Sequence, residues 1–545
     1  MGFRINDYQQ FNFNDRINKL TDRERAFLEK SWAKPFGDRI FPLIDESKFE
    51  VLYCNNNGRP NTPVNVVIGS LLLKEVLGLT DEELVDSIVL DPRFQYALHL
   101  TSFEEIPYSD RTPSRFRERL CLYELDTGED LIKEEIEQLA DEFVKLINIR
   151  GNLKRMDSLM VSSSSKKMGR LELIYTCVSN LVKALIEAGK DSMLSETLLK
   201  YGESSDKNAV CYRMDKDEVQ TRLETVTNDA LALFELCGES ERGHDEYKLL
   251  ERMLCDQTSD GKLKPSNEIS PHALQNPSDG DATYRRKAGK GHKGYAANIV
   301  EDCGEEGNII THYDFDINLH SDVEFGADAI EKLGQQEEKT ILIADGAYAS
   351  EENFDSAADN NIELVATALT GIKPPDIAAD FAIEDNEVVS CPAGHAPTDS
   401  NYNEKTGIIR AHFDKETCEN CPYRDECPVI MQKKRSLVKI STAAVERAEY
   451  TRKLSTEEYK EHARKRNGVE GVPSILRRRY GVDRMPVRGL LRSKMWFGFK
   501  IGAINVKRVI AAALNRPLSF NSPKLLTPIN FLRRFFMRNA HKVAC

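Results

Sequence analysis

The sequence lacks any apolar run of about 18 residues, the length that a transmembrane helix requires. Its first twenty residues lack the apolar core of a secretory signal peptide. The Met-Gly start has Asn6 where an N-myristoylation signal has Ser or Thr. These absences predict a cytoplasmic protein that neither spans a membrane nor is secreted.

The sequence also lacks an overall positive charge, because its 545 residues carry a net charge of −13. For nucleic-acid binding, however, the distribution of charge matters more than the total. Residues 464–508 hold 13 Lys or Arg and only two acids, Glu470 and Asp483. This block predicts a local surface for a polyanion, and a solvated helix face is the plainer alternative.

With 40% apolar and 30% charged residues, the chain is long enough to bury cores in two to four domains. No internal repeats are evident. The apolar spacing predicts a compact helical unit in the first 150 residues, where Thr80 and Glu83 form a capping box. Beyond it, a strand, a largely helical stretch, two strands, a helix and another strand predict a mixed α/β plan. The expected segments are 153–165, 170–255, 294–302, 308–318, 322–334 and the strand that ends at Asp345.

The segment ILIADGAYAS, residues 341–350, runs from an apolar strand directly into Asp345. A turn is the plain explanation, since Asp and Gly are common where strands stop. The other explanation is a metal ligand at the edge of a sheet. Asp157 also lies on an apolar strand, and the two acids would face each other if their strands are neighbours.

Glu470 is a candidate third acid, because it lies inside the basic block. On one continuous helix, Arg466, Glu470 and Arg477 would fall within about 40° of one another. The alternative is simple pairing between Glu470 and residues one turn away. Pro473 also indicates a kink or a helix start, which would weaken the argument from a shared face.

Three acids and flanking arginines predict a two-metal site for phosphoryl transfer. Carboxylate oxygens are the ligands that Mg²⁺ prefers, and guanidinium groups bind phosphate. In such a site one ion activates the attacking oxygen and the other stabilises the leaving oxygen.

Five segments in this order resemble the cut-and-paste insertion-sequence transposases of the DDE class. That group has a Tyr-Arg-Glu-Lys signature helix and an RNase H-like catalytic domain. The segments are YCNNNGRPNTPVNVV and its continuation to residue 100, RMDSLMVSSSS (155–165), SDGDATYRRKAGKGHKGYAANIVED (278–302), ILIADGAYAS (341–350) and RKRNGVEGVPSILRRRYGVDRMPVRGLLR (464–492).

The resemblance implies catalytic, Mg²⁺-binding roles for Asp157, Asp345 and Glu470, with two Mg²⁺ ions that Mn²⁺ can replace. Arg466 matches the signature Arg, which implies a grip on a phosphate near the transposon end. Arg477 falls on the signature Lys and keeps its charge but not its geometry. Ala463 falls on the signature Tyr, which is a departure from the family pattern.

Further DNA contacts are predicted outside the three acids. Arg478 and Lys293 lie in basic segments with the composition of phosphate-binding surfaces, for which a solvated surface is the alternative. Tyr348 is predicted either to stack on a base or to pack in the core. Sequence-specific readout of terminal repeats is expected from the N-terminal helical domain.

Four of the twelve cysteines are clustered: Cys391, Cys418, Cys421 and Cys427. A Cys-x-x-Cys pair with two further soft ligands is typical of structural zinc. The spacing is irregular, so free reduced thiols and a redox switch stay open as alternatives.

These interpretations combine into one expectation for the chain. The fold class is α/β: an RNase H-like mixed sheet with flanking helices, an all-helical N-terminal domain, and an insertion between the second and third acids.

The expected function is Mg²⁺-dependent cleavage of double-stranded DNA at transposon ends, followed by strand transfer. One alternative is a non-catalytic DNA-binding protein derived from a transposase, and another is a nuclease without strand transfer. A homodimer on DNA and a cytoplasmic, nucleoid-associated location are expected. The domains are 1–150 (helical, DNA-binding), 151–370 (core, with a helical insertion at about 166–270), 371–440 (cysteine-containing insertion), 441–515 (core helices with the third acid) and 516–545 (basic tail).

Overall fold

The computed structural model describes residues 2–6, 15–54, 60–101, 106, 108–212, 215, 218–287, 289–369, 371 and 373–515. The predicted basic tail, 516–545, lies outside them. The chain divides into two compact units, and the division runs through two adjacent strands. Among the described residues, the first unit holds those within 2–151, 302–313 and 491–515, and the second holds those within 152–301 and 314–490.

The first unit is mainly helical, as the N-terminal apolar spacing predicted. Thr80 and Glu83 form the predicted capping box, with each side chain accepting from the other's backbone N–H. The central helix α3 is buried nearly all round, which explains its almost continuous apolar sequence. The unit contains α1 (Asp22–Glu29), α2 (Ala33–Pro35), α3 (Val64–Leu77), α4 (Asp81–Leu90), α5 (Pro92–Ala97), α6 (Thr112–Thr127), α7 (Leu131–Leu146) and α19 (Leu490–Ala513) from residue 491 onward.

Ion pairs and hydrogen bonds link α19 to other elements of this unit. The Lys494 ammonium lies 2.9 Å from a Glu124 carboxylate oxygen and 3.2 Å from one of Asp130. The Asn505 amide exchanges hydrogen bonds with the backbone of Ile310. These buried polar groups are therefore paired, which avoids the cost of leaving them unsatisfied.

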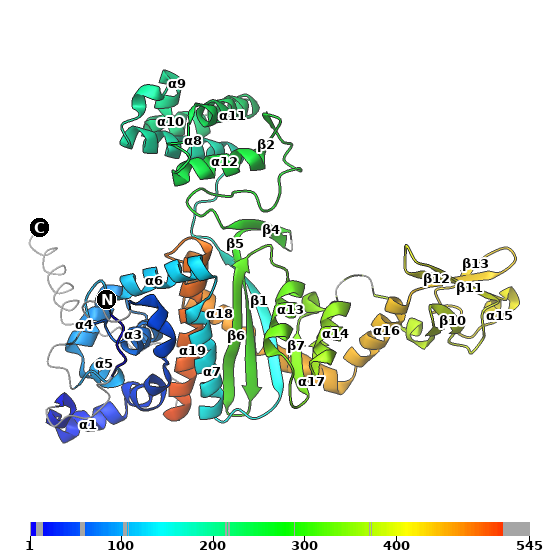
Figure 1. Ribbon diagram of the computed structural model, residues 1–545. Coiled ribbons are helices and arrows are strands. Elements are labelled where there is room, and N and C mark those ends of the chain that lie inside the picture. Colours follow the sequence, from blue (N-terminus) through cyan, green and yellow to red (C-terminus); the bar gives the residue numbers. More distant parts are fainter. Residues whose placement is uncertain are drawn as a thin grey trace, which may run out of the picture. The chain divides into compact units, whose positions relative to one another are not determined.

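Most of a mixed six-stranded sheet belongs to the second unit (Figure 1). The hydrogen-bonded order is β4-β5-β1-β7-β8, and β6 also pairs with β5. β1 and β7 are parallel, as are β7 and β8, whereas β4 and β5 are antiparallel. The strands are β1 (Leu153–Ser162), β4 (Thr283–Lys287), β5 (Lys290–Gly304), β6 (Gly307–Ile317), β7 (Thr340–Ala344) and β8 (Ile362–Ala366).

Helices α13 (Asp322–Leu333) and α14 (Glu351–Asp359) pack beside this sheet (Figure 1). Phe325 and Ile330 of α13 join Met156, Val300 and Leu342 of the strands in one apolar cluster. A mixed sheet covered by helices confirms the α/β class predicted from the sequence.

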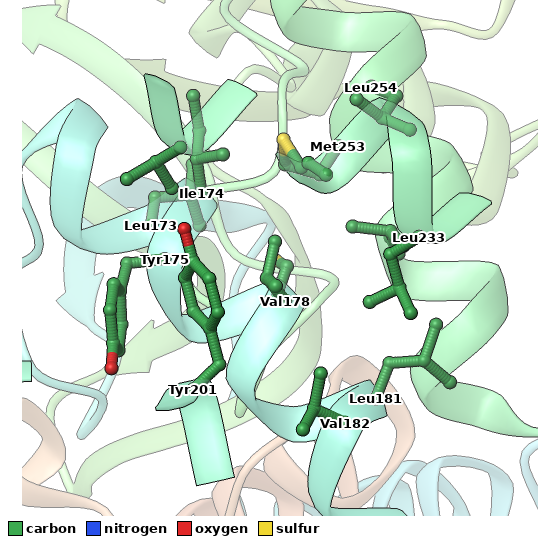
Figure 2. Packing of buried hydrophobic residues seen from close by; sticks show 14 of the residues in the cluster. Leu173, Ile174, Tyr175, Val178, Leu181, Val182, Tyr201, Leu233, Met253 and Leu254 are labelled. Atoms are coloured by element: carbon green, nitrogen blue, oxygen red, sulfur yellow. The ribbon is translucent and has the colours of Figure 1, made fainter. Parts of the chain in front are cut away.

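A separate helical bundle interrupts the chain between β1 and β4. Its core gathers apolar side chains of α8, α11 and α12 around Val178, Leu181 and Leu233 (Figure 2). Its elements are α8 (Arg170–Glu187), α9 (Glu196–Leu199), α10 (Ser204–Cys211), α11 (Val219–Leu236), α12 (Asp245–Gln257) and a short hairpin of β2 (Thr258–Ser259) and β3 (Lys262–Leu263).

Short strands follow β8 and form a small apolar core of their own. One sheet has the order β11-β12-β14-β13, and β9 pairs with β10. The elements are β9 (Ala382–Glu384), β10 (Glu387–Ser390), β11 (Asp399–Asn403), β12 (Ile408–Phe413), α15 (Lys415–Glu419), β13 (Ile430–Met431) and β14 (Ser436–Ile440), followed by α16 (Thr442–Leu454), α17 (Glu457–Asn467) and α18 (Gly471–Arg478). None of the described helices combines the length and apolar character needed to cross a bilayer.

Substitution Leu181→Ala is predicted to destabilise the helical bundle by about 2–5 kcal/mol, because a fully buried leucine leaves a cavity. Urea denaturation followed by circular dichroism measures the change. Leu236→Ala, which truncates an exposed leucine of the same bundle, is the matched control and should cost much less. Equal losses for the two variants would contradict the assigned core.

Candidate active site

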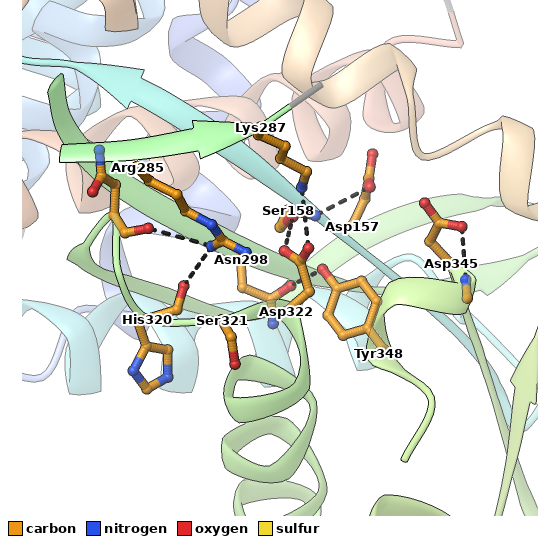
Figure 3. A network of polar contacts seen from close by, with 12 residues as sticks. Asp157, Ser158, Arg285, Lys287, Asn298, His320, Ser321, Asp322, Asp345 and Tyr348 are labelled. Carbon is orange, nitrogen blue, oxygen red and sulfur yellow. Dashed lines mark hydrogen bonds and ion pairs between the residues drawn. The ribbon is translucent and has the colours of Figure 1, made fainter. Parts of the chain in front are cut away.

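Asp157 lies on β1, in the interior of the sheet. Its carboxylate is largely buried and accepts a hydrogen bond from the Ser158 backbone N–H at 3.1 Å (Figure 3). Burial raises the pKa of Asp157, and the Arg466 guanidinium opposes that rise. The negative charges of Asp345 and Glu470 also raise it, so all three acids share one electrostatic environment.

Asp345 follows the last residue of β7, next to β1. The parallel register pairs Leu153 with Ile341 and Arg155 with Ile343. If this register is continued by two residues, Asp157 of β1 lies beside Asp345. The predicted neighbourhood of the two acid-bearing strands is therefore confirmed.

The turn after Asp345 depends on Gly346. Its backbone N–H donates to the Asp345 carboxylate at 2.6 Å. A Cβ at this position would lie only 2.1 Å from the backbone oxygen of Ala368. The turn explanation is therefore confirmed, and the carboxylate lies at the strand end, where a role as metal ligand remains a prediction.

Glu470 lies between two helices, α17 and α18. α17 ends at Asn467 and α18 begins at Gly471, with Pro473 in its first turn. The two helices are not continuous, so the argument that places Arg466, Glu470 and Arg477 on one helical face does not apply. Glu470 is exposed and lies near the other two acids because of the bend between the helices.

One guanidinium contacts all three acids. Arg466 reaches Asp157 at 3.5 Å and Asp345 at 3.8 Å through one terminal nitrogen, and Glu470 at 3.7 Å through the other. Its side chain is only 14% exposed. The three acids, far apart in the sequence, are therefore assembled around a single positive charge.

The chemistry of this donor set suits a hard divalent cation, because three carboxylates already surround a cationic group. Within the described part of the chain, no three metal-ligating side chains are close enough together to enclose a metal ion. The carboxylates converge on the Arg466 guanidinium, which takes the place of a cation among them.

A second polar network adjoins Asp157 (Figure 3). The Ser158 hydroxyl donates to Asp322 at 2.6 Å, and the Lys287 ammonium donates to the other Asp322 oxygen at 3.0 Å. Sequence reasoning identified neither Asp322 nor Lys287, since Asp322 appeared only as the start of a helix. In the sequence Asp322 looks like any acid of a first helical turn, and only the structure shows that it is buried.

Tyr348 lies in the apolar core of the sheet and is 1% exposed. Its hydroxyl donates to the Asn298 side-chain oxygen at 2.8 Å (Figure 3), and burial raises its pKa. The ring is therefore not accessible to a base, and of the two alternatives offered for Tyr348 the structure has core packing.

The other predicted phosphate ligands differ in their surroundings. Arg477 and Arg478 are both exposed, and the Arg477 Nε lies 3.4 Å from an Asp483 carboxylate oxygen. Lys293 is half-buried and donates to the backbone oxygen of Met168 at 3.1 Å. Burial lowers the pKa of Lys293. Of these three residues, the two arginines are the more available to a DNA backbone.

The four clustered cysteines line one small cavity of about 30 Å³, together with His395. Burial raises the pKa of Cys418 and Cys427, and the neighbouring thiols raise it further. The described cysteines form no disulfide bond with one another, and they do not converge closely enough to form a preformed metal site.

Two family models match the chain. A transposase DDE domain matches residues 390–510, which include Arg466, Glu470 and the four cysteines. A transposase domain, DUF772, matches residues 25–119 in the helical unit. No curated protein and no solved structure matches the chain. The two matches agree with the resemblance carried by the sequence motifs, and they support an insertion-sequence transposase of the DDE class.

Proposed function

We propose that this chain is an active, metal-dependent DNA transposase that cleaves at transposon ends and joins the freed ends to target DNA. One observation carries the proposal: Asp157, Asp345 and Glu470, from three distant segments, all lie within 3.8 Å of the Arg466 guanidinium. Acids without a shared role are not expected to converge in this way, since like charges repel.

Asp157, Asp345 and Glu470 are the residues that would hold two Mg²⁺ ions, or Mn²⁺ in their place. When bound, such ions activate the attacking oxygen and stabilise the leaving oxygen of an in-line displacement. The rigid strands β1 and β7 would fix two of the carboxylates, and the bend before α18 would present the third. An RNase H-like core is proposed on the support of this mixed sheet with acids on adjacent parallel strands.

The reaction has two phosphoryl transfers. In the first, a water oxygen attacks the phosphorus at the element's end, the bond from phosphorus to the 3′ oxygen breaks, and a free 3′-hydroxyl results. In the second, that hydroxyl attacks a target phosphodiester and displaces the 3′ oxygen of the target strand. One phosphodiester replaces another in this second step, so no external energy source is needed.

The basic residues around the acids would bind the DNA backbone. Arg466, Arg477, Arg478 and Lys293 are the proposed phosphate ligands, and their contribution would weaken with salt. Two copies of the chain are proposed to act on paired transposon ends, in the cytoplasm and on the nucleoid.

A non-catalytic DNA-binding protein derived from a transposase is the second candidate. A protein that had lost catalysis would have no need to keep three acids around one cation. Asp157, Asp345 and Glu470 are all present, which favours the catalytic function. A nuclease without strand transfer is a narrower third candidate, which an assay for joined products distinguishes.

Substitution Asp345→Asn is predicted to reduce cleavage of the element's own terminal repeats by about 100-fold or more, since it removes several kcal/mol of charge stabilisation. Cleavage is measured with Mg²⁺ on labelled DNA, and binding to the same DNA by gel shift should persist. Asp355→Asn, an exposed acid on α14, is the charge-matched control and should cleave normally. Undiminished cleavage by Asp345→Asn would refute the assignment.

The cysteine cluster is proposed to bind a structural zinc ion through Cys391, Cys418, Cys421 and Cys427. The support is that all four thiols line one cavity within the small β-rich core. The four cysteines would hold the ion as thiolates, and the ion would stabilise the fold of this segment.

Purified protein is predicted to contain about one zinc ion per chain, and Cys418→Ser to lose it, because a structural site needs all four ligands. Elemental analysis measures the metal content, and thermal unfolding with and without chelator measures its effect on stability. Cys255→Ser, which alters an exposed cysteine outside the cluster, is the control. Zinc-free protein with unchanged unfolding in chelator would favour the free-thiol alternative.

A further inference from the structure

Arg466 occupies an unusual position for a residue that is proposed to bind a DNA phosphate. Its guanidinium faces three carboxylates of its own chain, and it is largely buried. Its Nε is buried and has no hydrogen-bond partner among the described residues. A phosphate ligand that is ready for DNA would be expected to point toward solvent.

The contacts between Arg466 and the acids are ionic and loose. They measure 3.5–3.8 Å, whereas charge-assisted hydrogen bonds to carboxylates are typically about 2.7–2.9 Å. The guanidinium is shared among three partners and makes no tight bidentate pair with any of them. A cation held in this way can be replaced by a stronger one.

The backbone that carries Arg466 is fixed independently of its side chain. The Arg155 guanidinium donates to the backbone oxygen of Lys465 at 2.8 Å and pairs with the buried Glu301 at 2.9 Å. Gly468 packs so closely on Arg155 that a Cβ would lie 2.1 Å from its nitrogen. The Arg466 side chain can therefore leave the acids without unfolding the end of α17.

A divalent cation and the guanidinium cannot both lie among the same carboxylates, because like charges repel at short range. Arg466 is the penultimate residue of α17, and the exposed Arg477 and Arg478 follow on α18. A phosphate bound by this arginine-rich segment would offer the guanidinium a new anionic partner.

We propose that Arg466 is a displaceable counter-cation. In the DNA-free protein it assembles Asp157, Asp345 and Glu470, and it moves to a DNA phosphate when divalent cations bind. Metal binding and DNA binding are then coupled, and each strengthens the other by the same factor. This inference rests on the proposed function, because it assumes that the three acids bind the metal.

The first experiment measures Mn²⁺ binding to the full chain without DNA, by electron paramagnetic resonance of the free ion. Substitution Arg466→Gln removes the competing charge and is predicted to tighten Mn²⁺ binding about tenfold or more, equivalent to about 1.4 kcal/mol. Arg464→Gln removes the same charge from a side chain of α17 that is 72% exposed, and it should change the affinity less than about twofold. Equal or weaker binding by Arg466→Gln would overturn the proposal.

Two further variants show where the ion binds. Arg466→Lys keeps the charge but loses the forked reach to three acids, so its affinity should fall between those of wild type and Arg466→Gln. The double variant Arg466→Gln with Asp345→Asn should lose the gain in Mn²⁺ affinity, because one ligand of the ion has been removed. A double variant that retains tight binding would place the ion elsewhere and overturn the proposal.

The coupling is tested with a duplex that carries the terminal repeat and a phosphorothioate at the scissile position. This duplex should tighten Mn²⁺ binding to wild type, and the gain should be smaller in Arg466→Gln. An identical gain in both proteins would refute the exchange. None of these measurements needs turnover, so a protein that binds Mn²⁺ as predicted and cuts no DNA would contradict only the proposed function.

Discussion

The attraction between three carboxylates and one guanidinium is the interaction on which the candidate site depends. Without a positive charge among them, Asp157, Asp345 and Glu470 would repel one another, and Glu470 lies on a segment that no strand holds in place. Arg466 supplies that charge from within the chain. The site therefore places one cationic group among three carboxylates.

The backbone positions the three acids and Arg466 more than contacts among the acids do. Adjacent parallel strands bring Asp157 level with Asp345, and Gly346 lets the chain turn immediately afterwards. Arg155 ties the end of α17 to the sheet through the Lys465 backbone and Glu301. Because these supports lie outside the three acids, one acid can be substituted with little effect on the positions of the other two.

Much of this could be predicted from the sequence, and the reasons for the misses are physical. The sequence predicted both strands that carry Asp157 and Asp345, and the strand before Asp345 was marked by the continuous apolar run typical of a buried strand. The contact of Arg466 with all three acids, the burial of Tyr348 and the Ser158–Asp322–Lys287 network depend on tertiary packing, which local spacing does not encode. The break before α18 was indicated by Pro473, but an argument from a continuous helix could not include the bend.

A crystal structure of the full chain soaked with Mn²⁺ would show whether the three acids bind the ion, because the anomalous signal locates it. We expect density for Mn²⁺ in contact with oxygens of Asp157, Asp345 and Glu470, with the Arg466 guanidinium withdrawn from that position. Mn²⁺ bound at another place, with Arg466 still among the three carboxylates, would contradict this expectation.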